Sequence, residues 1–267
     1  MNILQEIADR TKERVEAQKK IIPLEQIKEM VCTNAGNSFP FEQALKSDDI
    51  AFICEIKKAS PSKGVIAEDF PYIDIAKDYE AAGAAAISVL TEPFYFMGND
   101  NYLREIADAV KIPLLRKDFT VDSYMIYEAK LLGASAVLLI CSILDSSTLA
   151  EYIAIAHKLG LSALVEVHCE KEISMALSAG ARIIGVNNRN LKTFEVDIAL
   201  SERLRKLVPP DILFVSESGI NSPIDIAKLR QIGANAVLIG ESLMRRQDKR
   251  AEINRLRGLE GGGYDKG

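Results

Sequence analysis

Short apolar runs, each followed by a helix-like stretch, recur through most of the chain. The runs are continuous rather than alternating, and Gly, Pro and polar residues bound them, which is typical of parallel strands buried on both faces. Strands of this kind that alternate with helices in a single chain favour a (βα)8 barrel, an α/β fold, over an open doubly wound sheet. The eight expected strands are Ala51–Ile56, Ala86–Leu90, Ile112–Leu115, Ala136–Ile140, Ala163–Val167, Ile183–Val186, Ile212–Val215 and Ala236–Ile239.

A recurring phrase supports this architecture. A Gly-Ala pair leads into an apolar run at Gly83, Gly133, Gly180 and Gly233, with spacings of 50, 47 and 53 residues. Helix-like sequence precedes each glycine and strand-like sequence follows it, so each position is typical of a helix C-cap that leads into a strand. The repeat therefore corresponds to two βα units.

The length of 267 residues fits one barrel of about 250 residues or nearly two average domains of roughly 150 each. A dinucleotide-binding fold would need G-x-G-x-x-G after the first strand, where this chain has the unrelated phrase Lys57–Gly64. We expect a single (βα)8 barrel domain over residues 1–267, with an N-terminal helical extension at 1–47, the barrel at 48–250 and a flexible tail at 258–267. The extension should contain two or three helices, broken near Pro23 and near Asn34–Pro40, that pack on the barrel.

Composition narrows the class of partner. The chain is 48% hydrophobic and 27% charged, close to the globular averages of roughly 45–50% and about 25%. Its formal net charge of -5 offers no electrostatic footprint for nucleic acid. The longest apolar run, Ala136–Cys141, is far shorter than the roughly 18 residues that span a bilayer, and no apolar signal segment is seen near the N-terminus. We therefore expect a cytoplasmic protein that binds neither nucleic acid nor membrane.

The cysteines indicate no metal or redox chemistry. Cys32, Cys54, Cys141 and Cys169 form no C-x-x-C pair and have no zinc-type spacing. Their neighbours are apolar or strand-like, so we expect reduced cysteines that pack in the interior.

Polar residues gather where the expected strands end, which is where barrels of this type carry their chemistry. Glu55 and Lys57 lie two residues apart at the end of the first strand, so they point to the same side. A single charge there is often only solvated, but five strands carry such groups. A lysine near carboxylates can act as general acid, Schiff-base nucleophile or substrate anchor, and the sequence leaves these roles open. The groups on the other strands are Lys117, Glu166, His168, Asn187, Arg189 and Glu217.

The last two strands indicate a phosphate site. Gly219 and Gly240 follow them and can place backbone N–H groups around an anion, although the same glycines could serve only tight turns. Glu241 is unfavourable beside a phosphate, so we expect its side chain to point away while its N–H contributes. The loop Lys58–Phe70 is long and polar enough to form a lid over a ligand, or it is a surface loop without a role.

The chain resembles the indole-3-glycerol-phosphate synthase family from the N-terminal helices through Arg245. The phrase E-x-K-x-x-S-P-S is specific, unlike a lone glycine motif. The densest stretches of resemblance are Glu55–Gly64, Ile87–Glu92, Arg116–Phe119, Gly185–Leu191 and Ser216–Ile220.

The resemblance implies a reaction and a set of roles. The substrate would be 1-(2-carboxyphenylamino)-1-deoxyribulose 5-phosphate, which closes to an indole ring with loss of carbon dioxide and water in tryptophan biosynthesis, without cofactor or metal. By resemblance, Lys117 matches the general acid of ring closure, Glu166 and Glu55 match carboxylates for proton transfer and positioning, and Lys57 lies between the phosphate and the reacting carbons. The implied substrate-binding residues are Ser60, Phe119, Asn187, Arg189, Glu217 and Ser218, and the implied phosphate-binding residues are Lys57, Gly219, Gly240 and Glu241.

The expected partner is thus a small phosphorylated substrate, and we expect a monomer that can associate weakly with other enzymes of the tryptophan pathway. Three alternatives stay open. A phosphoribosylanthranilate isomerase would carry Cys and Asp at the ends of strands one and six, where this chain has Glu55 with Lys57 and Asn187. An aldolase would trap its substrate on a lysine. A scaffold without turnover would not need the intact set Glu55, Lys57, Lys117 and Glu166.

Overall fold

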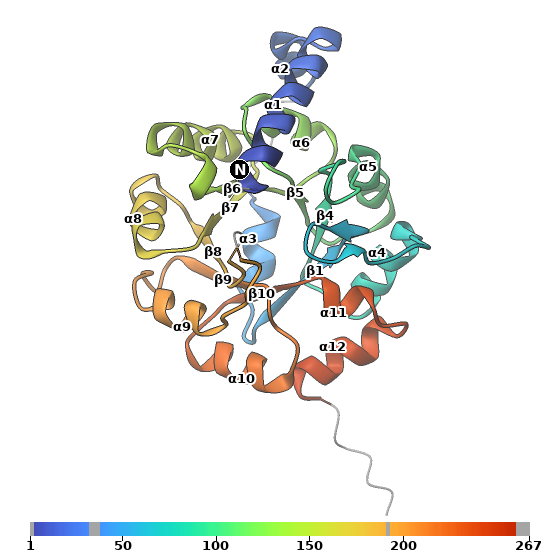
Figure 1. Ribbon diagram of the computed structural model, residues 1–267, viewed down its shortest axis with the longest axis vertical. Coiled ribbons are helices and arrows are strands. Elements are labelled where there is room, and N and C mark those ends of the chain that lie inside the picture. The colour runs from blue at the N-terminus through green and yellow to red at the C-terminus, as the bar shows by residue number, and fades with distance from the viewer. Residues whose placement is uncertain (1–2, 32–37, 191–192, 260–267) are drawn as a thin grey trace, which may run out of the picture.

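Eight parallel strands form a closed barrel in the computed structural model, which describes residues 3–31, 38–190 and 193–259. Each barrel strand pairs with the next barrel strand along the chain, and the first, β1, pairs with the last, β10, to close the cylinder. Helices surround the strands (Figure 1), so the expected (βα)8 barrel is confirmed. The strands are β1 (Ala51–Ile56), β4 (Ala86–Leu90), β5 (Leu114–Lys117), β6 (Ala136–Ile140), β7 (Ser162–Val167), β8 (Ile183–Asn187), β9 (Leu213–Glu217) and β10 (Ala236–Ile239).

The outer ring follows the predicted repeat. Its helices are α4 (Tyr72–Ala81), α5 (Asp100–Ala109), α6 (Tyr124–Leu131), α7 (Ser146–Lys158), α8 (Glu170–Ser178), α9 (Ala199–Arg205), α10 (Pro223–Gln231) and α12 (Lys249–Arg257), with the short α11 (Glu241–Met244) and the 3-10 turn η1 (Cys141–Ile143) between them. Gly83, Gly133, Gly180 and Gly233 follow α4, α6, α8 and α10 with φ of 79, 85, 84 and 75°. This left-handed conformation confirms them as the residues that end a helix and lead into a strand.

Side chains along each strand alternate between two cores. On β1, Phe52 and Cys54 point outward into the core beneath the helices, whereas Ala51 and Ile53 point into the barrel. The same alternation turns Glu55 inward. The barrel interior is thus mostly apolar toward the amino ends of the strands and polar at their carboxyl ends.

Three expected strands end too early, one of them, β8, by a single residue at Val186 instead of Asn187. The structure ends β5 at Lys117 rather than Leu115, and β9 at Glu217 rather than Val215. The predicted strands ended at the last apolar residue of each run. The polar residues that follow keep strand geometry because their side chains pair with other side chains in the fold. Arg116, for example, points outward and pairs with Asp100 and Glu128 at 2.7 Å each.

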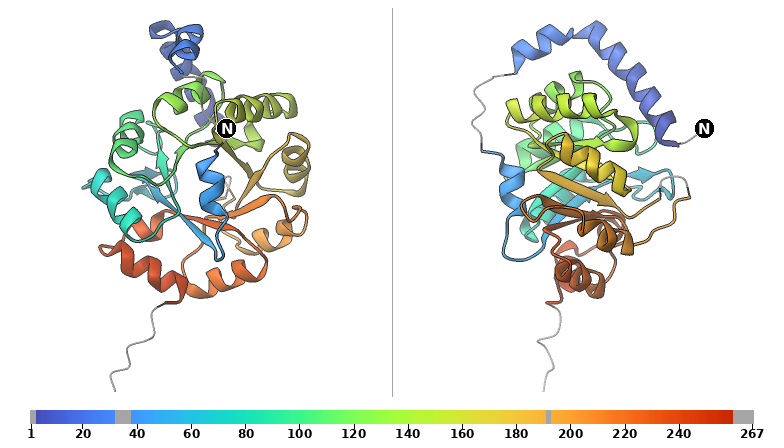
Figure 2. Two further views of the ribbon diagram at one scale, coloured as in Figure 1. Left: turned by 180° about the vertical axis from the view of Figure 1, so that it is seen from behind. Right: turned by 90° about the vertical axis from the view of Figure 1, so that its left-hand side faces the viewer.

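The N-terminal extension consists of α1 (Ile3–Ile21), α2 (Leu24–Met30) and α3 (Pro40–Leu45), which confirms the break at Pro23. Of the expected break near Asn34–Pro40, residues 34–37 lie outside the described part. Helix α3 closes the amino-terminal end of the barrel, opposite the end that α1 reaches (Figure 2). Phe41 and Leu45 are fully buried there, and Glu42 pairs with Arg182 at 2.7 Å.

Helix α1 is tied to the opposite end, the barrel mouth. Arg14 pairs with Asp118 at 2.8 Å and Lys19 pairs with Asp122 at 2.6 Å, both just beyond β5. These ion pairs hold the apolar first turns of α1 over the mouth.

At the C-terminus the ring continues past residue 250, at which the barrel was expected to end. Helix α12 runs to Arg257, and its Ile253 and Leu256 are buried in the outer core. Residues 260–267 of the expected tail lie outside the described part of the chain. No helix within the described residues is long and apolar enough to span a membrane.

The expectation of interior cysteines holds for Cys54 and Cys141, which are buried. It is wrong for Cys169, which is exposed because it lies at the N-cap of α8 on the surface. Cys32 lies outside the described residues.

Candidate active site

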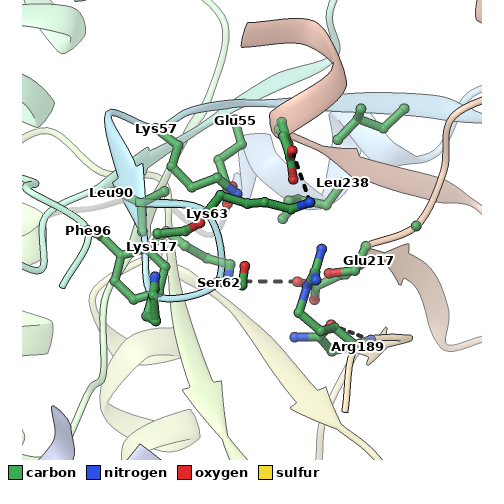
Figure 3. A pocket seen from close by; sticks show the side chains of 18 of the residues that line it. Glu55, Lys57, Ser62, Lys63, Leu90, Phe96, Lys117, Arg189, Glu217 and Leu238 are labelled. Atoms are coloured by element: carbon green, nitrogen blue, oxygen red, sulfur yellow. Dashed lines mark hydrogen bonds and ion pairs between the residues drawn. The ribbon is translucent and has the colours of Figure 1, made fainter. Parts of the chain in front are cut away.

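A cavity of about 760 Å³ opens at the carboxyl ends of the strands (Figure 3). All residues that the family resemblance implies for the site line it, whereas His168, also expected at the mouth, does not. The strand ends supply the charged groups, and the loops after β1 and β8 supply the rest of the rim. The predicted residues that meet here are Glu55, Lys57, Ser60, Lys117, Phe119, Glu166, Asn187, Arg189, Glu217, Ser218, Gly219, Gly240 and Glu241.

Glu55 and Lys57 form a close ion pair on one wall, with Nζ 2.5 Å from Oε1. Burial by itself raises the pKa of Glu55, but the ammonium groups of Lys57 and Lys117 outweigh it and hold that pKa below its usual value. The pair packs against Gly240, where an added Cβ would lie 2.5 Å from Glu55 Oε1 and 3.1 Å from Lys57 Nζ. A glycine is therefore required for the pair to reach the mouth.

Lys117 lies between two buried carboxylates. Its Nζ is 3.7 Å from Glu166 Oε2 and 3.9 Å from Glu217 Oε2. Burial alone would lower the pKa of Lys117, but the facing carboxylates outweigh it and raise that pKa above the usual lysine value. Lys117 is thus an ammonium group that can donate a proton or a hydrogen bond to a bound substrate.

Glu217 differs from its neighbours. Burial and the nearby Glu166 raise its pKa from 4.5 to about 8, and Lys117 only partly opposes them. At neutral pH its carboxyl group is largely protonated, so the mouth holds a neutral acid as well as Glu55, whose pKa is lowered. Such separation of carboxyl groups by environment is what acid and base chemistry at one site requires.

The raised pKa of Glu217 makes the free energy of unfolding depend on pH. Because the folded state binds this proton more tightly than the unfolded state, the stabilisation is complete below about pH 4.5 and is lost as the pH rises through about 8. Glu217→Gln, which cannot ionise, should flatten this part of the pH dependence in urea unfolding. Glu202→Gln, an exposed carboxylate on α9, is the control and should keep the wild-type slope. Equal slopes in wild type and Glu217→Gln would contradict the raised pKa.

Apolar side chains also line the cavity, and Phe96 and Leu90 lie on the side of Lys57 and Lys117 (Figure 3). The rings of Phe96 and Phe119 lie 6.3 Å apart between centroids, and Leu90 lies with them at the rim. Leu4 and Ile7 of α1 complete this wall. The mouth therefore combines charged groups with an apolar surface that suits a flat aromatic ring.

The loops after β8 and β9 are held by hydrogen bonds. Asn187 Oδ1 accepts from Arg189 N at 3.1 Å, and the Arg189 guanidinium donates to Phe194 O at 3.2 Å. Asn188 Nδ2 donates to Ser218 O at 3.1 Å and supports Ser218, whose φ of 68° is uncommon for a residue with a side chain. These contacts present Arg189 at the rim, where it can pair with an anion.

At the phosphate end, Glu241 contacts Lys63 at 3.8 Å and Arg245 at 3.3 Å. The carboxylate is thus paired with cations rather than isolated beside an anion site. The loop after β1 contains a small antiparallel hairpin, β2 (Ala59–Ser60) and β3 (Gly64–Val65), which brings Lys63 over the cavity (Figure 3). That this loop acts as a lid stays a prediction.

Sequence reasoning missed several lining residues. Lys63 and Arg245 carry charge to the phosphate end, and Ile3, Leu4 and Ile7 of the extension reach the mouth. For Ile3, Leu4 and Ile7 the apolar helical spacing was the available signal, but this spacing does not reveal which end of the barrel the helix covers.

Comparisons with known proteins show the family of the chain. The family model described as indole-3-glycerol phosphate synthase matches residues 4–256. The indole-3-glycerol phosphate synthase of Ruminiclostridium cellulolyticum is 62% identical over 96% of this chain and 99% of its own. That of Lachnoclostridium phytofermentans is 51% identical over 96% of this chain and 99% of its own. The solved 3-hexulose-6-phosphate synthase of Salmonella typhimurium shares the fold at TM-score 0.65 and 14% identity, over 79% of this chain and 98% of that one.

Proposed function

The chain belongs to the indole-3-glycerol phosphate synthase family, and from this premise we propose that it closes 1-(2-carboxyphenylamino)-1-deoxyribulose 5-phosphate to indole-3-glycerol phosphate, with loss of carbon dioxide and water. The observation that carries the proposal is Lys117 held between Glu166 and Glu217 beside an aromatic-lined wall. An ammonium group among carboxylates supplies proton donors and acceptors, and the apolar wall accepts the anthranilate ring.

We infer the orientation of this substrate from the groups that line the cavity. Lys57 and the backbone around Gly219 and Gly240 would bind the phosphate, with Lys63 close by. Arg189 would pair bidentately with the anthranilate carboxylate. Phe119 and the apolar face of α1 would hold the ring, with Ser60 and Asn187 at its edges. The reacting carbons would then lie between Lys117 and Glu166.

The chemistry divides into two halves. For ring closure, Lys117 would protonate the ketone oxygen as the ring carbon attacks the carbonyl carbon, and carbon dioxide then leaves to restore aromaticity. For dehydration, an acid protonates the hydroxyl group that leaves as water, and a carboxylate removes the remaining proton. Lys57 would serve as the acid and Glu166 as the base of this second half, and Glu55 and Glu217, which contact the two lysines, would position them.

The deciding experiment supplies the purified protein with this substrate, without added metal or nucleotide, and follows the fluorescence of the indole product. Folded protein that forms no product would overturn the proposal. Borohydride treatment followed by mass spectrometry tests the aldolase alternative, for which a substrate adduct on a lysine is expected.

Gly240→Val should raise KM and also lower kcat. The sequence alone predicts only blockade of the anion site, but a Cβ at Gly240 also meets the Glu55–Lys57 pair. We expect each parameter to change by about tenfold or more, because displaced catalytic groups lose alignment. Gly240→Ala provides the graded comparison in steady-state kinetics and should lie between wild type and valine. An unchanged KM in both variants would move the phosphate site elsewhere.

We also propose that the enzyme works in the cytoplasm as a monomer, binds neither nucleic acid nor membrane, and associates at most weakly with other tryptophan-pathway enzymes. The net charge of -5 favours no polyanion. Analytical ultracentrifugation across a concentration series tests the monomer, and a stable dimer at low concentration would contradict it.

A further inference from the structure

His168 lies directly beyond β7, two residues after Glu166 and therefore on the same side of the chain. Its side chain is 19% exposed and lies between two carboxylates. Nε2 is 3.4 Å from Glu166 Oε1, and Nδ1 is 3.4 Å from Glu172 Oε2. Each ring nitrogen thus faces an anionic oxygen.

This arrangement fits the imidazolium form. A neutral imidazole carries one N–H and one lone pair, so one of its nitrogens would place a lone pair against a carboxylate oxygen. The protonated ring carries an N–H on both nitrogens and can attract both carboxylates. Burial by itself lowers the pKa of His168, but the contact with Glu172 and the charge of Glu166 outweigh it and raise that pKa above 6.5.

Glu172 is the fixed end of the chain of contacts. It lies in the first turn of α8, and its Oε2 accepts the backbone N–H of His168 at 2.6 Å. Glu172 is therefore fixed on a helix outside the cavity, and His168 lies between Glu172 and Glu166.

Glu166 lies at the other end of this chain of contacts. Its Oε1 faces His168, whereas its Oε2 faces Lys117 at 3.7 Å. Each oxygen of Glu166 thus faces a nitrogen of a basic side chain at ion-pair distance, which favours the orientation in which Oε2 points toward Lys117.

We propose that His168 is a positioning residue for Glu166, and that the chain Glu172–His168–Glu166 holds the proton-transfer carboxylate in its working orientation. This inference rests on the proposed function, in which Glu166 accepts the proton during dehydration. His168 itself does not touch the reacting atoms.

The pairing gives activity a defined pH dependence. The groups that face the imidazole are Glu166 on β7, Glu172 on α8 and, farther off, Glu217 on β9. Lys117 forms an ion pair with Glu166 from the other side of that carboxylate. The Cys141 thiol contacts the backbone oxygen of Glu172 at 3.8 Å. Because the folded-state pKa of His168 is raised, its hold on Glu166 is complete below about pH 6.5 and is lost as the pH rises through that raised value.

Imidazole NMR tests the pairing without any assay of turnover. The chain has 2 histidines, so a sample labelled in histidine gives two ring signals, and His157→Gln assigns them. His157 is the internal reference, since burial and Arg182 lower its pKa to about 4. We expect His168 to titrate above an ordinary histidine, and Glu166→Gln and Glu172→Gln each to move its titration to lower pH. Titration at or below 6.5, or no response to Glu166→Gln, overturns the proposal.

Kinetics tests the positioning role. His168→Leu should lower kcat about tenfold while KM changes by less than about threefold, because substrate contacts stay intact. The acid limb of the kcat profile should move to higher pH, since a positive charge beside Glu166 is lost. His168→Gln, which keeps a donor toward Glu166, should recover part of the rate, and His157→Gln should match wild type. An unmoved pH profile, or an equal loss in His157→Gln, refutes the role.

No product from the wild type would overturn the proposed function, and NMR would still decide the pairing.

Discussion

Lys117→Met should lower kcat by roughly 10²–10⁴-fold, the range that a positioned general acid supplies. Methionine matches the length of lysine but cannot protonate the ketone oxygen. The structure supports this choice of residue because the charge of Glu166, with that of Glu55, keeps Lys117 an ammonium group. Stopped-flow or steady-state fluorescence of the indole product measures the change.

The control is Lys111→Met, an exposed lysine that precedes the same strand at the opposite end of the barrel. It should keep wild-type turnover. Lys117→Met should also destabilise the fold more at about pH 9 than at about pH 5. Lys117 holds down the pKa of Glu217, so its loss raises that pKa above about 8, and the free energy of unfolding goes on falling at higher pH than in the wild type. Turnover near the wild-type value in Lys117→Met would remove it from the mechanism.

Gly185→Ala should lower kcat by about 10²-fold through Glu217, although Gly185 carries no functional group. Gly185 lies on β8 and faces the barrel interior, where an added Cβ would overlap Glu217 Oε1 and lie 3.1 Å from Leu164 Cδ1. The displaced carboxyl group would no longer face Lys117. Steady-state kinetics should show the loss mainly in kcat.

A double-mutant cycle provides the control for Gly185→Ala. Glu217→Asp shortens the side chain and makes room for the new Cβ, so the double variant should lose less activity than the two single losses combined. Urea unfolding of each variant separates a local displacement from loss of the fold. Strictly additive losses would show that Gly185 does not act through Glu217.

Local regularities explain how much of the fold could be read from the sequence. Parallel strands buried on both faces must be continuously apolar, and a helix that leads straight into a strand needs a residue with positive φ, which Gly83 and Gly133 provide. These constraints act over a few residues, so they leave a pattern in the chain. The misplaced ends of β5 and β9 occur where polar residues such as Arg116 keep strand geometry through tertiary partners.

Much of the candidate site was predictable for the same reason. A barrel brings the carboxyl ends of its strands to one mouth, so Glu55, Lys57, Lys117 and Glu166 had to meet once the fold was inferred. Alternation along β1 also placed Glu55 and Lys57 on one side, and the structure pairs them at 2.5 Å.

By itself, the sequence determined the barrel, its glycine junctions and the residues at its mouth, because each depends on a short-range period or on a strand end. The tertiary structure alone decided that α1 walls the cavity, that Gly185 makes room for Glu217, and that His168 bridges Glu166 and Glu172. Those features depend on distances between segments far apart in the chain and on burial. Charge states follow the same rule, since the raised pKa of Glu217 arises from desolvation and a neighbouring carboxylate on another strand.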